Sequence, residues 1–121
     1  MANTFKVVTL AAEPNSAGTP YVVYTAGSGV TAVVLGLILT NINTAQVTAE
    51  VELVSDTGSR GGSNDVTNGT AFLAKDIPIP VGSSVELLSG NKVVLETTDQ
   101  IRIDCSVADK LSGALSVMEI T

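Results

Sequence analysis

Residues 47–53 read VTAEVEL, so that every second side chain is apolar and the side chains between them are polar. Successive side chains of a β-strand point to opposite faces, and a period of two therefore predicts a strand with one buried face and one face in water. Residues 101–107 (IRIDCSV) repeat the pattern. We expect Cys105 on a buried face, and Glu52 and Asp104 on faces in water.

The rest of the chain extends this pattern into an all-β fold. Valine, isoleucine and threonine, whose branched side chains favour strands, make up nearly a third of the residues. Short apolar runs alternate with turn sequences, and no segment of helical length carries an apolar stripe. We expect a turn at residues 111–113 and strands at residues 5–10, 20–25, 30–40, 46–54, 71–78, 84–88, 92–96, 100–107 and 113–120.

Length and strand spacing together predict one domain. The chain has 121 residues, which is enough for a single core. Short strands at this spacing are typical of an antiparallel β-sandwich or a jelly-roll-like barrel, and we predict such an all-β domain for residues 1–121. Within it, residues 1–14 are a candidate N-terminal arm, and residues 55–70 form a polar, glycine-rich loop.

Two of the expected strands, 30–40 and 113–120, are apolar on both faces. Strict alternation gives them a second apolar face, with Val33, Leu35, Leu37 and Leu39 on the first strand and Ala114, Met118 and Ile120 on the second. The candidate interface residues are the larger side chains of this face: Leu35, Leu37, Leu39, Met118 and Ile120. A strand that is apolar on both faces must be covered on both, and a two-layer domain supplies one cover. The cover of the second face comes either from a loop or arm of the same chain or from a neighbouring subunit. In the second case these residues form the subunit interface of a homo-oligomer, which we expect to be a trimer.

Composition excludes several functions. The chain has no histidine and a single cysteine, which excludes imidazole catalysis, zinc sites and an internal disulfide. Its formal net charge of −6 argues against nucleic acid as a partner. The longest apolar run, residues 30–39, is about half as long as a membrane-spanning helix, so no membrane partner is expected. The first residues lack the features of a signal peptide, and we expect folding in a reducing cytoplasm.

No group of residues has the pattern of an active site. A nucleophile would need a lysine or a carboxylate as its base, because histidine is absent. Cys105 is expected to be buried and inert, and the pair Glu50 and Glu52 is typical of surface charge. The loop 55–70 matches neither a phosphate-binding loop nor an EF-hand. We therefore expect a non-enzyme with no catalytic residue, no metal and no cofactor.

Several stretches follow one another in an order known from one class of proteins. They are residues 24–36 (YTAGSGVTAVVLG), 76–88 (DIPIPVGSSVELL), 89–96 (SGNKVVLE) and 116–121 (SVMEIT). In this order the chain resembles small virion structural proteins of tailed bacteriophages over residues 20–121.

The resemblance implies a non-enzymatic component of a phage particle. Its first implication is a capsid decoration (cement) protein, a small β-rich and commonly trimeric protein on the outer head surface that binds the major capsid protein. A tail, neck or baseplate accessory protein is the alternative. A third interpretation is a host-surface carbohydrate-binding module. The chain has only two tyrosines, two phenylalanines and no tryptophan on which a sugar ring could stack, and this argues against it.

For a decoration protein, the N-terminal segment is the candidate capsid contact. Its apolar anchors are Phe5, Val7, Val8 and Leu10, and an arm can add a strand to an exposed sheet edge of the capsid. The loop 55–70 is a weaker candidate, because ordering a glycine-rich loop costs entropy. The alternative is that residues 5–10 form the first strand of the chain's own sheet.

Overall fold

The computed structural model describes residues 2–55, 69–88 and 92–121. These residues form strands and no helix, so none of them belongs to a helix long and apolar enough to cross a membrane. Each predicted strand overlaps one observed strand, and the all-β prediction is confirmed. The strands are β1 (Asn3–Glu13), β2 (Tyr21–Thr25), β3 (Thr31–Asn41), β4 (Val47–Ser55), β5 (Gly69–Ile79), β6 (Ser84–Leu87), β7 (Val93–Leu95), β8 (Gln100–Cys105) and β9 (Leu111–Ile120).

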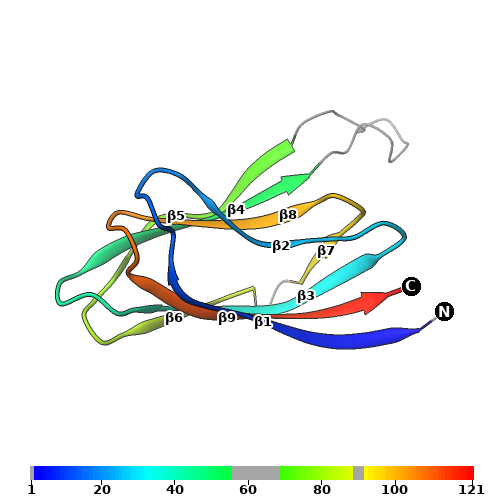
Figure 1. Ribbon diagram of the computed structural model, residues 1–121, viewed down its shortest axis with the longest axis horizontal. Helices are drawn as coiled ribbons and strands as arrows, with labels where there is room; N and C mark the ends of the chain where they lie inside the picture. Colours follow the sequence, from blue (N-terminus) through cyan, green and yellow to red (C-terminus); the bar gives the residue numbers. More distant parts are fainter. Residues whose placement is uncertain (1, 56–68, 89–91) are drawn as a thin grey trace.

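The strands form two antiparallel sheets that pack face to face (Figure 1). The five-stranded sheet has the order β1-β9-β3-β6, and β7 pairs with the first half of β3. The four-stranded sheet has the order β2-β8-β4-β5. Pairing is nested: β4 pairs with β5, β3 with β6 and β7, β2 with β8, and β1 with β9. This nesting is the connectivity of a jelly roll, so the predicted sandwich is confirmed in its jelly-roll form.

The core lies between the two inner faces. As the alternation in residues 47–53 predicts, Val47, Ala49 and Val51 of β4 are buried there, together with the alternating isoleucines of β8. The five-stranded sheet contributes the side chains that pack against them, which are chiefly Val34, Leu37, Leu39, Leu95, Leu111, Leu115 and Val117.

A β-bulge at Leu35 changes which side chains of β3 face this core. The register with β9 shifts between Val34 and Gly36, and the extra residue reverses the alternation beyond it. Leu37 and Leu39 are therefore fully buried on the same face as Val34. The prediction that Leu37 and Leu39 lie on the second apolar face is wrong for this reason.

The N-terminal segment is a strand of the chain's own sheet. β1 pairs with β9 from Asn3, opposite Ile120, to Glu13, opposite Leu111. It forms one edge of the five-stranded sheet and lies in its plane, so it does not cover the outer face of that sheet (Figure 1).

The connection between β8 and β9 differs from the sequence prediction. The chain turns within residues 106–110, before the predicted turn at 111–113. Val107 lies in this turn and is exposed, whereas the alternation places it on the buried face. Gly113 is inside β9, where a β-carbon would stand 2.2 Å from the carbonyl oxygen of Ile38. Glycine at position 113 therefore allows the backbones of β9 and β3 to approach closely within the sheet, and it does not form a turn.

Candidate interaction surface

The outer face of the five-stranded sheet is apolar. Phe5 and Val7 of β1 are 71% and 64% exposed, Val94 of β7 is 53% exposed and Ile38 of β3 is 41% exposed. This sheet is the lower layer in Figure 1, and no described segment runs beneath it. Within the described residues, neither a loop nor an arm therefore covers this face.

The strand register joins several of these side chains into one row. Phe5 pairs with Met118, Met118 with Val33, and Val33 with Val94. Directly paired residues of antiparallel strands share a face, with β-carbons about 4.5–5.5 Å apart. The row therefore crosses β1, β9, β3 and β7 as one continuous apolar stripe.

A shallow hollow lies beside this stripe. It has a volume of about 400 Å³ and follows the small residues Gly36, Ala114 and Ser116. No atom lies within 4 Å of the place where a β-carbon of Gly36 would stand, so its floor is open. A second hollow of about 360 Å³ adjoins it toward Phe5, and Leu35 and Ser116 line both. We call the two together the outer hollow.

The same face carries almost no charge. In the five strands of this sheet, the register assigns one charged side chain to the outer face, Glu86 of β6, which pairs with Ile38. Glu86 and Lys6, a residue of the edge strand β1, are the charged residues that line the outer hollow. The chain as a whole has a formal net charge of −6. Most of its charge therefore lies elsewhere.

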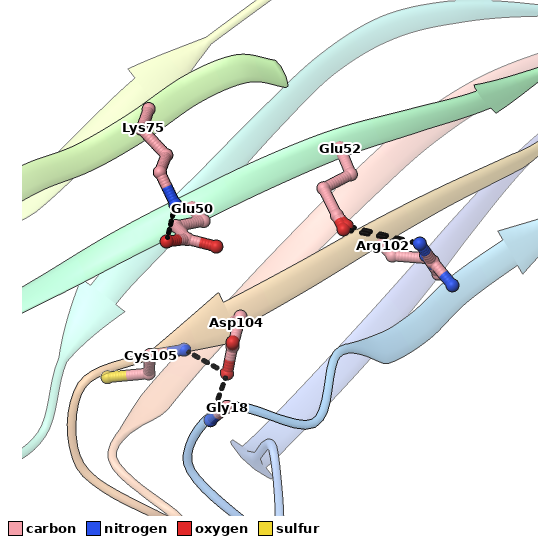
Figure 2. Close-up of polar contacts among 7 residues, drawn as sticks. All are labelled: Gly18, Glu50, Glu52, Lys75, Arg102, Asp104 and Cys105. Carbon is pink, nitrogen blue, oxygen red and sulfur yellow. Dashed lines mark hydrogen bonds and ion pairs between the residues drawn. The ribbon is translucent and has the colours of Figure 1, made fainter. Parts of the chain in front are cut away.

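The outer face of the four-stranded sheet carries a network of ion pairs (Figure 2). Lys75 Nζ lies 2.6 Å from Glu50 Oε1 and 4.6 Å from the centre of the Phe72 ring. The hydrogen bond with Glu50 raises the pKa of Lys75. Arg102 Nη2 donates to both carboxylate oxygens of Glu52, at 3.2 and 3.1 Å. Each glutamate of the predicted pair is thus held by its own cation.

Two carboxylates on this face are covered, although the alternation places them in water. Asp104 Oδ1 accepts hydrogen bonds from the backbone N–H groups of Gly18, at 3.1 Å, and Cys105, at 2.8 Å. Gly18 belongs to the connection between β1 and β2, which approaches the face at this point (Figure 2). Asp104 and Glu52 are both buried. The prediction of exposure is wrong because this connection and the Arg102 side chain cover them.

Two of the three carboxylates that line a hollow beside this network are engaged by other groups of the chain. This hollow of about 360 Å³ is lined by Glu50, Asp76 and Asp104. Glu50 is bound to Lys75, and Asp104 accepts two backbone N–H groups. Among the described residues, no group of three or more acidic or cysteine side chains is placed to hold a metal ion. Cys105 is buried, as predicted, and burial raises the pKa of its thiol, which keeps it protonated.

A third polar cluster joins the two sheets at one end of the sandwich. The Tyr24 hydroxyl of β2 donates to Glu119 Oε2 of β9, and Lys6 Nζ of β1 lies 2.8 Å from Glu119 Oε1. The hydrogen bonds from Lys6 and Tyr24 lower the pKa of Glu119. Burial, followed by the hydrogen bond to Glu119, raises the pKa of Tyr24. This cluster holds the layers together.

The structure combines residues that the sequence assigned to two different contacts. Leu35, Met118 and Ile120 were predicted for a subunit interface, and Phe5 and Val7 for a capsid contact. All five belong to the outer face of the five-stranded sheet. The remaining candidates face the core, because the pleat of β1 and the bulge of β3 turn them inward: Val8, Leu10, Leu37 and Leu39.

Sequence reasoning missed other parts of this face. Val94 extends the apolar stripe onto β7, and Gly36 opens the floor of the outer hollow. Which residues become neighbours across strands depends on register, and a single sequence carries no signal for it. The predicted loop 55–70 lies, for residues 56–68, outside the described residues.

No family model and no curated protein matches the sequence. Among solved structures, the chain is similar to VP2 of infectious bursal disease virus in a subviral particle, with 15% identity and a TM-score of 0.51 over 96% of this chain and 32% of that one. A structure of the Gx strain of this virus gives 14% identity and a TM-score of 0.51 over the same shares, 96% and 32%. A chain of the disulfide-linked pili of Bacillus endospore appendages gives 17% identity and a TM-score of 0.44 over 98% of this chain and 84% of that one. This chain thus spans about a third of the viral chains, and the likeness to them is one of fold.

Proposed function

We propose that this chain is a non-enzymatic structural subunit of a phage particle and, within that class, a capsid decoration protein. The observation that carries the proposal is the uncovered apolar face of the five-stranded sheet. A contiguous exposed apolar patch on a small protein is often a protein interaction site. The polar clusters of the same domain are held in ion pairs and backbone hydrogen bonds, and these serve stability.

Two further findings support this proposal. The sequence resembles virion structural proteins over residues 20–121, which includes β9 and β3, the two central strands of the apolar face. The jelly-roll sandwich is a fold that viral capsid proteins use, and the similar VP2 chain is from a virus particle. Lectins use the fold as well, but Phe5 is the single aromatic side chain among the residues that line the outer hollow, and neither tyrosine nor tryptophan is there for a sugar to stack on.

The proposed location is the outer surface of the head, after synthesis in the host cytoplasm. The proposed partners are further copies of the chain, in a homotrimer, and the major capsid protein. Phe5 and Val7 are the predicted capsid contacts that remain exposed, whereas Val8 and Leu10 belong to the core. Because one face accommodates one partner at a time, either a second copy or the capsid protein covers the apolar face.

Copy number in purified virions tests the proposed function. Quantitative mass spectrometry is expected to find the chain in a fixed and high ratio to the major capsid protein, and on heads separated from tails. Recombinant protein added to undecorated heads is expected to bind them and to raise their temperature of thermal disruption.

Two outcomes contradict the proposal. A few copies that fractionate with purified tails would assign the chain to the tail, neck or baseplate. A chain that is absent from virions and does not bind heads would not be a structural subunit of the particle.

A further inference from the structure

We infer that a second copy of this chain covers the apolar face, with Phe5 of one copy seated in the part of the outer hollow at Gly36 and Ala114 of the next. The inference deepens the proposed function and rests on it, since it names one partner of the structural subunit. Three properties of the face support it: its area, its lack of charge, and the presence of both a projecting side chain and a hollow.

The strongly exposed apolar side chains supply about half of the area that one partner buries in a standard interface. From their exposed fractions, Phe5, Val7, Ile38 and Val94 leave on the order of 400 Å² of apolar side chain in water. The partly buried members of the face and its polar rim add to this. A standard protein interface buries about 800 Å² on each partner, so the whole face is of the size that one further copy covers.

Charge favours a copy of this chain as the occupant. Two chains with a formal net charge of −6 each repel one another, and this repulsion is smallest when they meet through surfaces that carry few carboxylates. Glu86 is the one charged side chain that the register places on the outer face of these five strands, and it lies on β6, at the edge opposite β1, where it lines the far end of the hollow. The acidic network lies on the other sheet, so contact through the apolar face keeps the charged faces of two copies apart (Figure 2).

The shape of the face is complementary to itself. Phe5 projects from β1 at one edge, and the hollow at Gly36, Ala114 and Ser116 follows β9 and β3 toward the other edge. The hollow is displaced from Phe5 along the strands as well as across them, since Gly36 pairs with Ser116, two residues from Met118 on β9. A rotation axis that crosses the face obliquely to the strands, between Phe5 and the hollow, therefore places Phe5 of one copy opposite the hollow of its neighbour. Each copy then gives one phenyl ring and receives one, and the contact closes into a ring of two or three copies.

The contact is tested by the oligomeric state of the full chain in solution. Light scattering and sedimentation velocity measure its mass over a range of concentrations. Phe5→Ser removes the projecting ring. Gly36→Leu fills the hollow from within, and the fold accommodates it because the position has open space and no positive φ. Phe72→Ser is the matched control, since Phe72 is 52% exposed on the opposite face.

We expect the wild-type chain to be oligomeric. Phe5→Ser and Gly36→Leu should each raise its dissociation constant by roughly tenfold or more, as the loss of a central aromatic anchor does. Phe72→Ser should leave the constant unchanged. Circular dichroism and thermal unfolding of each variant check that the fold is retained.

Cross-linking checks the pairing itself. Phe5→Cys and Ala114→Cys are placed in separate preparations, both with Cys105→Ala, and are mixed under oxidising conditions. A disulfide between the two variants is expected to form faster than one between Phe72→Cys and Ala114→Cys. Equal rates would overturn the assignment of Phe5 to the hollow.

The remaining outcomes separate this inference from the proposed function. A wild-type monomer that binds heads would overturn the contact between copies and leave the decoration role standing. An oligomer that depends on Phe5 but is absent from virions would contradict the decoration role alone. An oligomer that neither Phe5→Ser nor Gly36→Leu weakens would overturn the inference.

Discussion

Tyr24 of the four-stranded sheet donates a hydrogen bond to Glu119 of the five-stranded sheet, and this bond joins the two layers at one end of the sandwich. Lys6 holds the other oxygen of the same carboxylate at 2.8 Å. The pKa of Glu119 is lowered and the pKa of Tyr24 is raised, so the folded chain favours the carboxylate and the neutral phenol. Stability should therefore decline at both ends of the pH range.

On the acid side, we expect Glu119 to stabilise the fold above its ordinary pKa of 4.5 and to lose this effect as the pH falls through the lowered value. The reason is that the unfolded chain takes up the proton first. Urea unfolding of wild type and Glu119→Gln at a series of acidic pH values measures this. The variant should be less stable at neutral pH and should show a shallower loss in acid. Parallel curves would show that Glu119 does not contribute.

On the alkaline side, the effect of Tyr24 should be fully present below its ordinary pKa of 10.0 and should be lost as the pH rises above it. The unfolded chain ionises there, while burial and Glu119 keep the folded phenol protonated. Tyr24→Phe should flatten the alkaline decline of the unfolding midpoint. Tyr21→Phe is the control for removal of a phenol. A decline of equal slope in both variants would contradict the assignment.

Gly113→Ala should destabilise the fold severely. Its β-carbon would stand 2.2 Å from the Ile38 carbonyl oxygen, so β9 and β3 would have to separate. We expect a loss of about 3 kcal/mol or more in the free energy of unfolding. Gly27→Ala is the control, because its nearest neighbour is a side-chain atom at the ordinary distance of 3.8 Å. Equal stability of the two variants would show that the strands can relax.

The buried ion pair on the four-stranded sheet should behave as a unit. Arg102→Ala leaves the Glu52 carboxylate, whose side chain is 7% exposed, without its cation. We expect the free energy of unfolding of this variant to fall by roughly 2–3 kcal/mol. This is less than for a fully buried pair, because Arg102 is partly exposed. The double variant Arg102→Ala, Glu52→Val should recover part of the lost stability, because it removes the unpaired carboxylate as well. A double-mutant cycle on Lys75 and Glu50, where the lysine is exposed, should show weaker coupling.

Cys105 should be inert in the folded chain. It is buried on the core side of β8, and burial raises the pKa of its thiol, so reactive thiolate is scarce. A thiol reagent should label native protein several orders of magnitude more slowly than unfolded protein. Val107→Cys in a Cys105→Ala background provides an exposed thiol on the adjoining turn as a positive control. Rapid native labelling of Cys105 would mean that this end of the core opens readily.

The strands could be predicted from sequence because period-two alternation is a local signal. Residues 47–53 and most of 101–107 have the buried faces that the alternation predicts. The second face of β3 could not be predicted, because β3 is apolar on both sides and the bulge at Leu35 leaves no trace in such a pattern.

The candidate surface was predictable only in part. The sequence identified two-sided apolar strands and exposed apolar residues near the N-terminus, but it assigned them to separate contacts. These residues lie on one face because Phe5 pairs with Met118, and the two are far apart in sequence. The burial of Asp104 likewise depends on Gly18, a distant residue that alternation within β8 does not report.

The place of β9 between β1 and β3 has a consequence for how the chain is made. β9 follows every other described strand in sequence, yet it supplies the pairing partner of both the first strand and the third. A ribosome therefore releases β1 and β3 long before residues 111–120 emerge, and both wait with open edges. Pairing across such a sequence distance slows folding. Arrival of β9 should thus be the event that closes the five-stranded sheet and completes the fold.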